Sequence, residues 1–309
     1  MIPVNSVLQV GYFPEIMQAE IDRRFKPTPH LDPAAAVPTG NFEAILIRSN
    51  TKLPEALVKQ LPSIRMVATC GVGYDNLPLG YLKERGIKAS NTPGVLNDAV
   101  CELAIGMLLG LLRRIPEAQD FVKSTGWSKG LFKLTTTLAG KRVGIAGMGR
   151  IGQDLADRLL PFKVEIAYCG PNPKDLPYTY FKNIKDLAMA CDVLLLACPA
   201  TPDTEKMINA EVLEALGPNG YLINIARGSV VDEAALLYAL QHNKIAGAAL
   251  DVFENEPNLN AAFLNLDNVL LTPHIGSATT ETRIAMTNLA VDNLEAFFNQ
   301  QSLLTEVKN

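Results

Sequence analysis

Arg227, Glu256 and His274 are the residues of this sequence whose types and spacing best fit acid–base chemistry on an anionic substrate. Each follows an apolar run typical of a buried strand, so all three are expected at the ends of successive strands, where α/β sheets bind ligands. Arginine offers a planar fork for a carboxylate, and glutamate can hydrogen-bond a histidine ring and favour its protonated form. Together they would make an anion clamp, a proton donor and a group that tunes the donor. Singly, they would be ordinary surface charges and a capping histidine.

The remaining histidines and the cysteines argue against other kinds of chemistry. His30 lies in a proline-rich stretch and His242 at a predicted helix end, so both are expected to be solvated and inert. The cysteines show no CxxC spacing, and Cys70, Cys191 and Cys198 flank apolar strands, which predicts buried reduced thiols and no metal site. No GxSxG nucleophile elbow occurs. Hydride chemistry on a bound cofactor remains.

A glycine-rich turn at 147–152 predicts a dinucleotide site. An apolar strand at 141–146 precedes it, a helical pattern follows, and a second apolar run at 164–168 completes a βαβ unit. In that setting the glycines permit a tight turn, close approach of the backbone to a pyrophosphate, and tight packing of helix on strand. A tight turn without a ligand is the alternative. The residues predicted to contact the cofactor here are Gly147, Met148, Gly149, Arg150, Ile151 and Gly152.

The choice between NADP and NAD depends on the residues after the second strand of that unit. Units that select NAD place an acidic residue there, about 20 residues after the glycine turn, to bind the ribose hydroxyls. Cys169 takes that position, so no carboxylate repels a 2′-phosphate. Asn172, Lys174 and Arg150 are the available donors, while Pro171 stands where an arginine is usual. The sequence predicts NADP as the preferred cofactor, with NAD, or use of both, as the alternative.

These residues need a scaffold that brings strand ends to one edge, and the apolar pattern predicts an α/β fold. Apolar strands alternate with helices, which indicates doubly wound parallel sheets covered on both faces. At 309 residues, two domains are expected: a dinucleotide-binding domain at 98–284 and a substrate domain at 1–97 plus 285–309. Residues 26–40 are expected to form a loop. The predicted strands are 6–11, 44–48, 66–70, 87–90, 192–198, 221–225, 245–251 and 269–271, and the predicted helices are 15–25, 54–60, 79–85, 97–115, 205–216, 232–242 and 279–298.

Composition limits the partners and the compartment. A net charge of −4 and a pI near 5.5 argue against a broad nucleic-acid-binding surface. The longest apolar stretch, 103–112, ends at Arg113 and Arg114, so no transmembrane helix is expected. The N-terminus lacks the basic and apolar regions of a secretory signal. We expect a cytoplasmic protein that binds neither nucleic acid nor membrane.

Several ordered motifs resemble those of the D-isomer-specific 2-hydroxyacid dehydrogenase family over essentially the whole chain. Besides the glycine turn, they are ATCGVGYDN at 68–76, NTPG at 91–94, PATPDT at 199–204, NIARG at 224–228, DVFENEP at 251–257 and TPHIG at 272–276. The resemblance implies a Rossmann cofactor domain inserted in a flavodoxin-like substrate domain. It is strongest to the NADP-preferring glyoxylate/hydroxypyruvate reductase branch. Formate dehydrogenases carry Gln where Glu256 stands, which disfavours that branch.

The resemblance also implies roles for individual residues. Arg227, Glu256 and His274 match the catalytic set that reduces a short 2-oxo acid to a D-2-hydroxy acid, and Asp251 matches an aspartate near the nicotinamide carboxamide. The loop whose backbone amides bind the substrate carboxylate matches Gly71, Val72 and Gly73. Further cofactor contacts are implied at Pro199, Thr204, Ala226 and Gly276. An aryl-pyruvate (hydroxyphenylpyruvate) reductase and a non-catalytic, dinucleotide-sensing corepressor-like protein are the alternatives.

Two features predict a homodimer. The helix expected at 98–112 is too apolar all round for a simple surface helix. The loop 124–138 holds Trp127 and is suited to wrap a partner, as the resemblance implies. A helix buried in the core of a monomer is the alternative.

Overall fold

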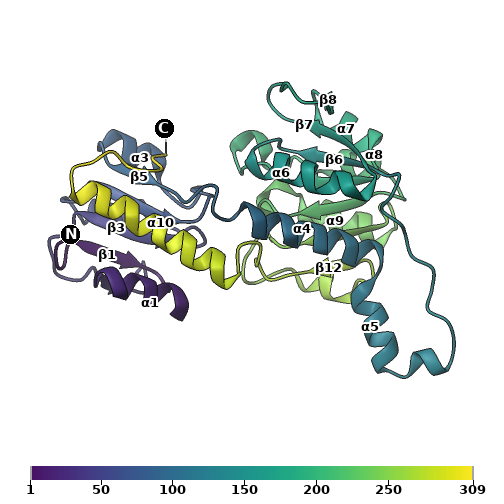
Figure 1. Ribbon diagram of the computed structural model, residues 1–309, viewed down its shortest axis with the longest axis horizontal. Helices are drawn as coiled ribbons and strands as arrows, with labels where there is room; N and C mark the ends of the chain where they lie inside the picture. Colours follow the sequence, from purple (N-terminus) through teal and green to yellow (C-terminus); the bar gives the residue numbers. More distant parts are fainter. Residues whose placement is uncertain (1, 308–309) are drawn as a thin grey trace. The chain divides into compact units, whose positions relative to one another are not determined.

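The computed structural model describes residues 2–307, which form two compact units (Figure 1). Within the described residues, unit 1 comprises 2–96 and 277–307, and unit 2 comprises Asn97–Gly276. The second boundary lies at 276/277, before the predicted 284/285, because the last helix, α10 (Thr280–Phe298), packs on unit 1. A helix is one rigid element, so all of it joins the unit whose core it covers.

Unit 1 is built on a five-stranded parallel sheet in the order β2-β1-β3-β4-β5, which is the order of flavodoxin-like folds. Successive side chains of a strand point to opposite faces. Ala44 and Leu46 of β3 therefore face one core, and Ile45 and Ile47 face the other. The strands are β1 (Val7–Val10), β2 (Thr28–His30), β3 (Ala44–Arg48), β4 (Met66–Cys70) and β5 (Lys88–Ser90).

Helices cover both faces of this sheet. α1 (Glu15–Arg24) and α10 pack on one face, and α2 (Glu55–Lys59) and α3 (Leu79–Glu84) pack on the other. Because the strands are parallel, their carboxyl ends meet at one edge. Ser49 N–H, just after β3, donates to the Cys70 carbonyl at that edge, 3.1 Å away.

The loop predicted at 26–40 was wrong for residues 28–30. The structure places the short strand β2 within this stretch, where it pairs with β1 at the edge of the sheet. His30, predicted to be solvated, is 4% exposed and lies opposite Val10 in the register. Pro29 is tolerated because an edge strand needs only one side of its backbone for pairing. The prolines of this stretch conceal the strand in the sequence.

Unit 2 is built on a seven-stranded parallel sheet in the order β12-β11-β10-β9-β6-β7-β8. Counted from β6, this is the 3-2-1-4-5-6 order of dinucleotide-binding folds with one strand added, and the order reverses between β6 and β9. The predicted α/β fold with doubly wound parallel sheets is confirmed. The strands are β6 (Arg142–Ala146), β7 (Glu165–Cys169), β8 (Thr179–Phe181), β9 (Val193–Leu196), β10 (Tyr221–Asn224), β11 (Gly247–Leu250) and β12 (Val269–Leu271).

The helices of unit 2 also lie on both faces of its sheet. α4 (Asn97–Leu112) and α6 (Arg150–Leu159) cover one face. The opposite face is covered by α7 (Ile184–Ala190), α8 (Ala210–Leu216) and α9 (Glu233–Gln241). The predicted helix 97–115 is interrupted at Arg114, which has a φ of 51°, and α5 (Ile115–Lys123) follows. The sequence analysis missed β8 and α7.

Short 3₁₀ segments complete the secondary structure. They lie at Gly126–Ser128, Leu160–Phe162, Pro202–Thr204, Gly228–Val230 and Ala261–Asn265. Among residues 2–307, no helix combines the length and the apolar character that crossing a bilayer requires.

Candidate active site

The glycine turn between β6 and α6 leaves a ligand room to approach the backbone. Gly147 has a φ of +98°, and a Cβ there would lie 2.6 Å from the Cα of Cys198. A Cβ on Gly152 would lie 2.1 Å from the Gly147 carbonyl oxygen, so this glycine lets the helix pack against the turn. A Cβ on Gly149 would meet nothing within 4 Å. The turn therefore fits a pyrophosphate over Gly149, with the N-terminus of α6 behind it.

The residues between these glycines are placed differently from one another. Gly149 is the N-cap of α6. Glycine has no side chain to cap the helix, so no side chain accepts hydrogen bonds from its first N–H groups. Arg150 is exposed, whereas the Met148 side chain is 3% exposed and packs in the core beneath the turn. Met148 can thus meet a cofactor only through its backbone. The turn lies where the strand order reverses, which is the usual ligand position in such sheets.

The loop after β7 is held by two tyrosines that the sequence analysis did not single out. The Tyr168 hydroxyl accepts a 2.7 Å hydrogen bond from the Lys174 N–H and donates to the Lys174 carbonyl at 3.2 Å. The Tyr180 hydroxyl donates to the Gly170 carbonyl at 3.1 Å. The side chains of Asn172 and Lys174 are exposed. The loop from 169 to 174 contains no acidic residue.

The segment after β9 is a compact turn organised by its own side chains. The Thr204 hydroxyl donates to the Pro199 carbonyl at 2.8 Å and accepts the Thr201 N–H at 2.8 Å. Thr204 was expected to contact the cofactor. The hydroxyl is engaged inside the turn, so the side chain shapes the segment 199–204.

The loop that carries Arg227 is anchored by a buried amide. Asn224, at the end of β10, is 1% exposed; its side chain accepts the Ala226 N–H and donates to the Arg227 carbonyl, each at 3.0 Å. The guanidinium of Arg227 donates to the Ala226 carbonyl at 2.8 Å. Gly228 then packs so closely on the next loop that a Cβ there would lie 2.0 Å from the carbonyl carbon of Phe253.

Asp251 organises the loop that presents His274. This aspartate is 2% exposed, and its carboxylate accepts the Thr272 hydroxyl at 2.6 Å and the N–H groups of Ile275 and Gly276, each at 2.8 Å. The resemblance implied a contact with the nicotinamide carboxamide. The structure gives Asp251 three protein donors, so its first role here is to fix residues 272–276. A carboxylate has about four acceptor positions, which leaves room for one further donor.

His274 and Glu256 form the central pair of the site. Nδ1 of His274 lies 2.5 Å from Oε2 of Glu256, and the two side chains are 36% and 29% exposed. Burial alone would raise the pKa of Glu256, but the hydrogen bond and charge of His274, the Phe253 N–H and the charge of Arg227 together lower it. Glu256 is therefore held as a carboxylate. With Nδ1 occupied, the other ring nitrogen of His274 is the one available to a substrate.

The backbone at His274 is strained. Its φ is 53°, in the left-handed region that a side chain with a Cβ seldom adopts, and its N–H donates to the Thr272 carbonyl at 3.0 Å. Such conformations cost about 1–3 kcal/mol and persist where surrounding contacts impose them. The three hydrogen bonds to Asp251 are contacts of that kind.

In unit 1, the segment 71–73 follows β4. The N–H of Gly71, expected to bind a substrate carboxylate, instead donates to the Thr92 hydroxyl at 2.9 Å. Gly71 is required for space, because a Cβ there would lie 2.1 Å from the Ser49 hydroxyl oxygen. Within the described residues, the N–H groups of Val72 and Gly73 donate to no protein acceptor. These two amides remain the candidates for a carboxylate.

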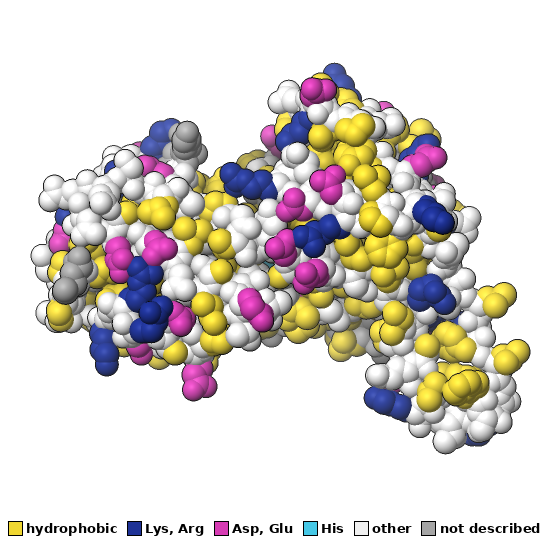
Figure 2. Space-filling view, in the orientation of Figure 1, with side chains coloured by type: hydrophobic (Ala, Val, Ile, Leu, Met, Phe, Trp, Pro, Cys, Tyr) yellow, Lys and Arg dark blue, Asp and Glu magenta, His cyan; other side chains and the backbone are white. Residues whose placement is uncertain are grey.

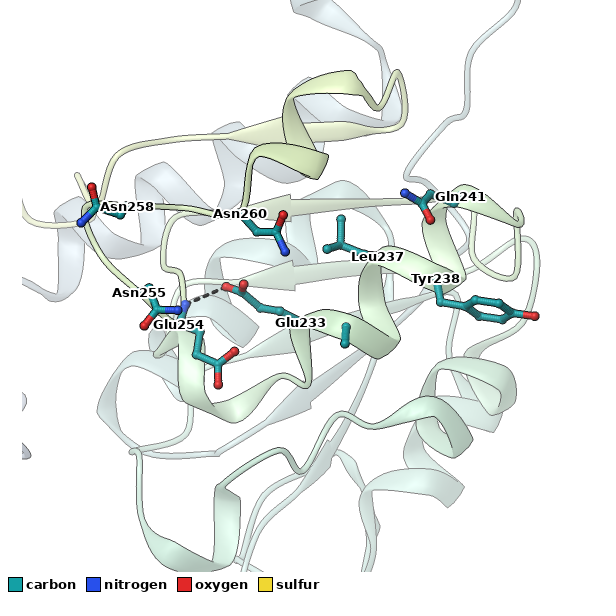
Figure 3. Close-up of a pocket in the computed structure, with 9 residues that line it drawn as sticks. Glu233, Leu237, Tyr238, Gln241, Glu254, Asn255, Asn258 and Asn260 are labelled. Atoms are coloured by element: carbon teal, nitrogen blue, oxygen red, sulfur yellow. Dashed lines mark hydrogen bonds between the residues drawn. The ribbon is translucent and has the colours of Figure 1, made fainter.

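A separate pocket of about 600 Å³ lies between α9 and the segment 254–260 (Figure 3). Glu233 reaches from α9 to this segment and accepts the Glu254 N–H at 2.6 Å (Figure 3). Neither Arg227 nor His274 lines the pocket, so it is distinct from the site at the strand ends. Its lining residues are Glu233, Ala234, Leu237, Tyr238, Gln241, Glu254, Asn255, Asn258 and Asn260.

Sequence reasoning missed several residues on which this geometry depends. Asn224 and Thr272 lie inside motifs that it quoted, but their roles come from side-chain hydrogen bonds. Gly228 directly follows Arg227, and a glycine beside a candidate site residue is a usable signal for close backbone packing. For Tyr168 and Tyr180 the strand pattern gives no such signal, since aromatic residues are common in strands.

Comparison with known proteins places the chain in a family. The family model for the D-isomer specific 2-hydroxyacid dehydrogenase, NAD binding domain, matches residues 105–276. A hydroxyphenylpyruvate reductase from Plectranthus scutellarioides is 43% identical over 308 residues, which cover 98% of each chain. A glyoxylate/hydroxypyruvate reductase from Arabidopsis thaliana is 41% identical over 308 residues, again 98% of each chain.

A solved structure agrees over nearly the whole length. The NADPH-dependent glyoxylate/hydroxypyruvate reductase from Sinorhizobium meliloti, in complex with NADP and malonate, superposes with a TM-score of 0.94 at 42% identity. The match covers 99% of this chain and 97% of that one. The chain therefore belongs to the family of D-isomer specific 2-hydroxyacid dehydrogenases.

Proposed function

We propose that this protein reduces short 2-oxo acids of the glyoxylate and hydroxypyruvate type to D-2-hydroxy acids, with NADPH as the preferred reductant. The observation that carries the proposal is the 2.5 Å contact between His274 and Glu256, in the same unit as a turn that fits a dinucleotide. Relatives named as glyoxylate/hydroxypyruvate and hydroxyphenylpyruvate reductases support the reaction class.

In the proposed mechanism the chain supplies binding, orientation and a proton. The bound nicotinamide supplies the hydride. Arg227 holds the substrate through charge-assisted hydrogen bonds, and the Val72 and Gly73 amides are assigned to its carboxylate. His274 donates a proton to the oxygen that becomes negative at C2, a step worth about 10²–10⁴-fold in rate. Glu256 accepts from Nδ1 and thereby aims the opposite ring nitrogen at that oxygen.

The substrate range separates this proposal from its alternatives. NADPH oxidation should be followed at 340 nm with glyoxylate, hydroxypyruvate, pyruvate and hydroxyphenylpyruvate, and kcat/KM compared. Among these four acids, each of which carries a single carboxylate, we expect the highest value with glyoxylate or hydroxypyruvate. A clear preference for hydroxyphenylpyruvate would make the protein an aryl-pyruvate reductase. Cofactor binding with negligible turnover of every acid would support the corepressor-like alternative and contradict the proposal.

The cofactor preference rests on the loop after β7. Cys169 occupies the position at which an acidic residue would favour NAD, and the exposed side chains of Asn172, Lys174 and Arg150 are the donors available to a 2′-phosphate. The NADP bound in the Sinorhizobium meliloti enzyme supports the same preference.

Replacing Cys169 by aspartate is expected to shift the preference toward NADH. A carboxylate at this position would repel the 2′-phosphate and accept the ribose hydroxyls, so the ratio of kcat/KM for NADPH to that for NADH should fall about tenfold or more. Cys169→Ser, which keeps the size and stays neutral, is the matched control and should leave the ratio nearly unchanged. Equal or better use of NADH by the unmodified enzyme would refute the preference.

We also propose a homodimer, on a different basis from the apolar helix. α4 is largely buried in the core of unit 2, so its composition is explained within one chain. The better support is the arm formed by α5 and the segment to 137, which extends from the body of unit 2 and exposes apolar side chains (Figures 1 and 2). Val122, Trp127, Leu131 and Leu134 are 53%, 70%, 94% and 98% exposed. An apolar patch of this kind marks an interaction surface.

Light scattering at micromolar concentration is expected to give twice the chain mass of 33.5 kDa. Glutamate at both Leu131 and Leu134 should lower the mass toward that of one chain without loss of secondary structure, because both side chains are exposed in the single chain. A mass of 33.5 kDa for the unmodified protein would refute the dimer.

A further inference from the structure

Arg48 and Arg283 form a cluster of positive charge at the carboxyl edge of the unit 1 sheet. Arg48 is the last residue of β3 and pairs in register with Cys70, the last residue of β4. Arg283 lies in the first turn of α10, the helix that packs against β4. Both guanidinium groups act electrostatically on the Cys70 thiol, and Arg48 also acts on Arg283. Three elements of the unit thus bring two cations to one place.

Neither cation has a carboxylate to balance it. Among residues 2–307, no ion pair involves Arg48 or Arg283, and the Arg48 guanidinium makes only a long 3.4 Å hydrogen bond to the Tyr12 carbonyl. By contrast Arg24, on α1 of the same unit, is held by Asp292 at 2.6 Å and by Glu295 at 2.5 Å. Both arginines are half-buried, and desolvation of a charge that lacks a partner is unfavourable.

The surroundings add positive potential instead of removing it. Burial lowers the pKa of both arginines, and the neighbouring charge of Arg48 lowers that of Arg283 further. Burial raises the pKa of the Cys70 thiol to about 12, so the thiol is neutral and offers no compensating charge. Arg283 also stands near the N-terminus of α10, where the helix dipole is positive and a cation is disfavoured. A bound anion would offset the desolvation of the two arginines and the repulsion between their positive charges.

The cluster lies directly beside the segment assigned to the substrate. Cys70 immediately precedes residues 71–73, and Ser49, which follows Arg48, lies against Gly71. From this juxtaposition we propose that Arg48 and Arg283 bind a second anionic group of the substrate, so that the enzyme favours 2-oxo acids carrying a carboxylate or a phosphate in addition to the reacting 2-oxo carboxylate. This inference rests on the proposed reduction of 2-oxo acids and narrows its substrate class.

Matched pairs of substrates test the inference. Oxaloacetate differs from pyruvate by one carboxylate, and 3-phosphohydroxypyruvate differs from hydroxypyruvate by one phosphate. With NADPH, we expect kcat/KM to be at least tenfold higher for the dianionic member of one pair, since hydrogen bonds to charged groups are worth that much. The pair that shows the preference identifies the anion as carboxylate or phosphate.

Substitution of each arginine shows whether the cluster is the cause. Arg48→Gln and Arg283→Gln should each reduce kcat/KM for the preferred dianion at least tenfold more than for its monoanionic partner. Arg23→Gln, which removes an exposed cation from the same unit, should leave both values unchanged. In the NADPH-loaded protein, calorimetry should show malonate binding more tightly than acetate, and the two cluster variants should lose that difference.

Three outcomes would contradict either the second-anion inference or the proposed reductase activity. A wild-type preference for the monoanion in both pairs would overturn the inference while leaving the reductase proposal intact. Equal losses on monoanion and dianion in the arginine variants would also overturn it, because the cluster would then serve the common carboxylate. Absence of turnover with every 2-oxo acid would refute the reductase proposal, and the malonate measurement would still decide whether the cluster binds a second anionic group.

Discussion

Replacing His274 by alanine is expected to lower kcat by about 10²–10⁴-fold, the range for loss of a positioned general acid. The reason is geometric: Glu256 holds Nδ1 at 2.5 Å and Asp251 fixes the loop that carries the ring, so His274 is a positioned proton donor. The effect should fall mainly on turnover, since the proton is needed only as charge develops on the substrate oxygen.

The control for this experiment is the other exposed histidine of unit 2. His242 is the C-cap of α9, stacks on Tyr238 with 4.0 Å between ring centroids, and lies outside the motifs at 224–228 and 251–257. His242→Ala should leave kcat unchanged. NADPH binding, measured by fluorescence, should survive in His274→Ala. Unimpaired turnover in that variant would remove His274 from the mechanism.

Replacing Gly228 by alanine is expected to lower kcat/KM by about 10²-fold and the free energy of unfolding by about 1–3 kcal/mol. A Cβ at Gly228 would lie 2.0 Å from the carbonyl carbon and 2.1 Å from the carbonyl oxygen of Phe253. These are backbone atoms, so they cannot rotate away. The loop carrying Arg227 must separate from the loop carrying Glu256, and a displacement of about 1 Å in a catalytic group is enough for this loss.

Gly106→Ala supplies a matched comparison for that variant. Gly106 lies in α4 of the same unit, and a Cβ there would meet nothing within 4 Å. Alanine in a helix interior is favoured over glycine by about 0.5–1 kcal/mol, so this variant should be at least as stable as the parent and equally active. If Gly228→Ala behaved in the same way, close packing of the two loops would not be needed for activity.

The positions of polar residues directly after apolar strands explain which parts of the site could be predicted from the sequence alone. Arg227, Asp251 and His274 each follow a buried apolar run, and parallel strands bring such positions to one edge. The glycine turn was equally accessible, because strand, turn and helix all leave a periodic signal. The edge strand β2 was not, since its prolines resemble those of a loop and only its pairing with β1 makes it a strand.

Hydrogen bonds between residues of the loops that form the site could not be predicted from the sequence. Asp251 was assigned to the nicotinamide carboxamide; that its carboxylate also accepts hydrogen bonds from Thr272, Ile275 and Gly276 depends on the path of the loop. The positive φ of His274 is likewise imposed by its surroundings. Left-handed backbone is signalled most clearly by glycine, and a single histidine is too weak a signal to predict it.

The central claim is that a hydride passes to C2 of a 2-oxo acid and yields the D product. NADPH carrying deuterium at both C4 positions of the nicotinamide should be mixed with hydroxypyruvate and the enzyme, and the glycerate analysed by mass spectrometry and chiral chromatography. The account predicts one deuterium, located at C2, in D-glycerate. L-Glycerate, or glycerate without deuterium at C2, would contradict it.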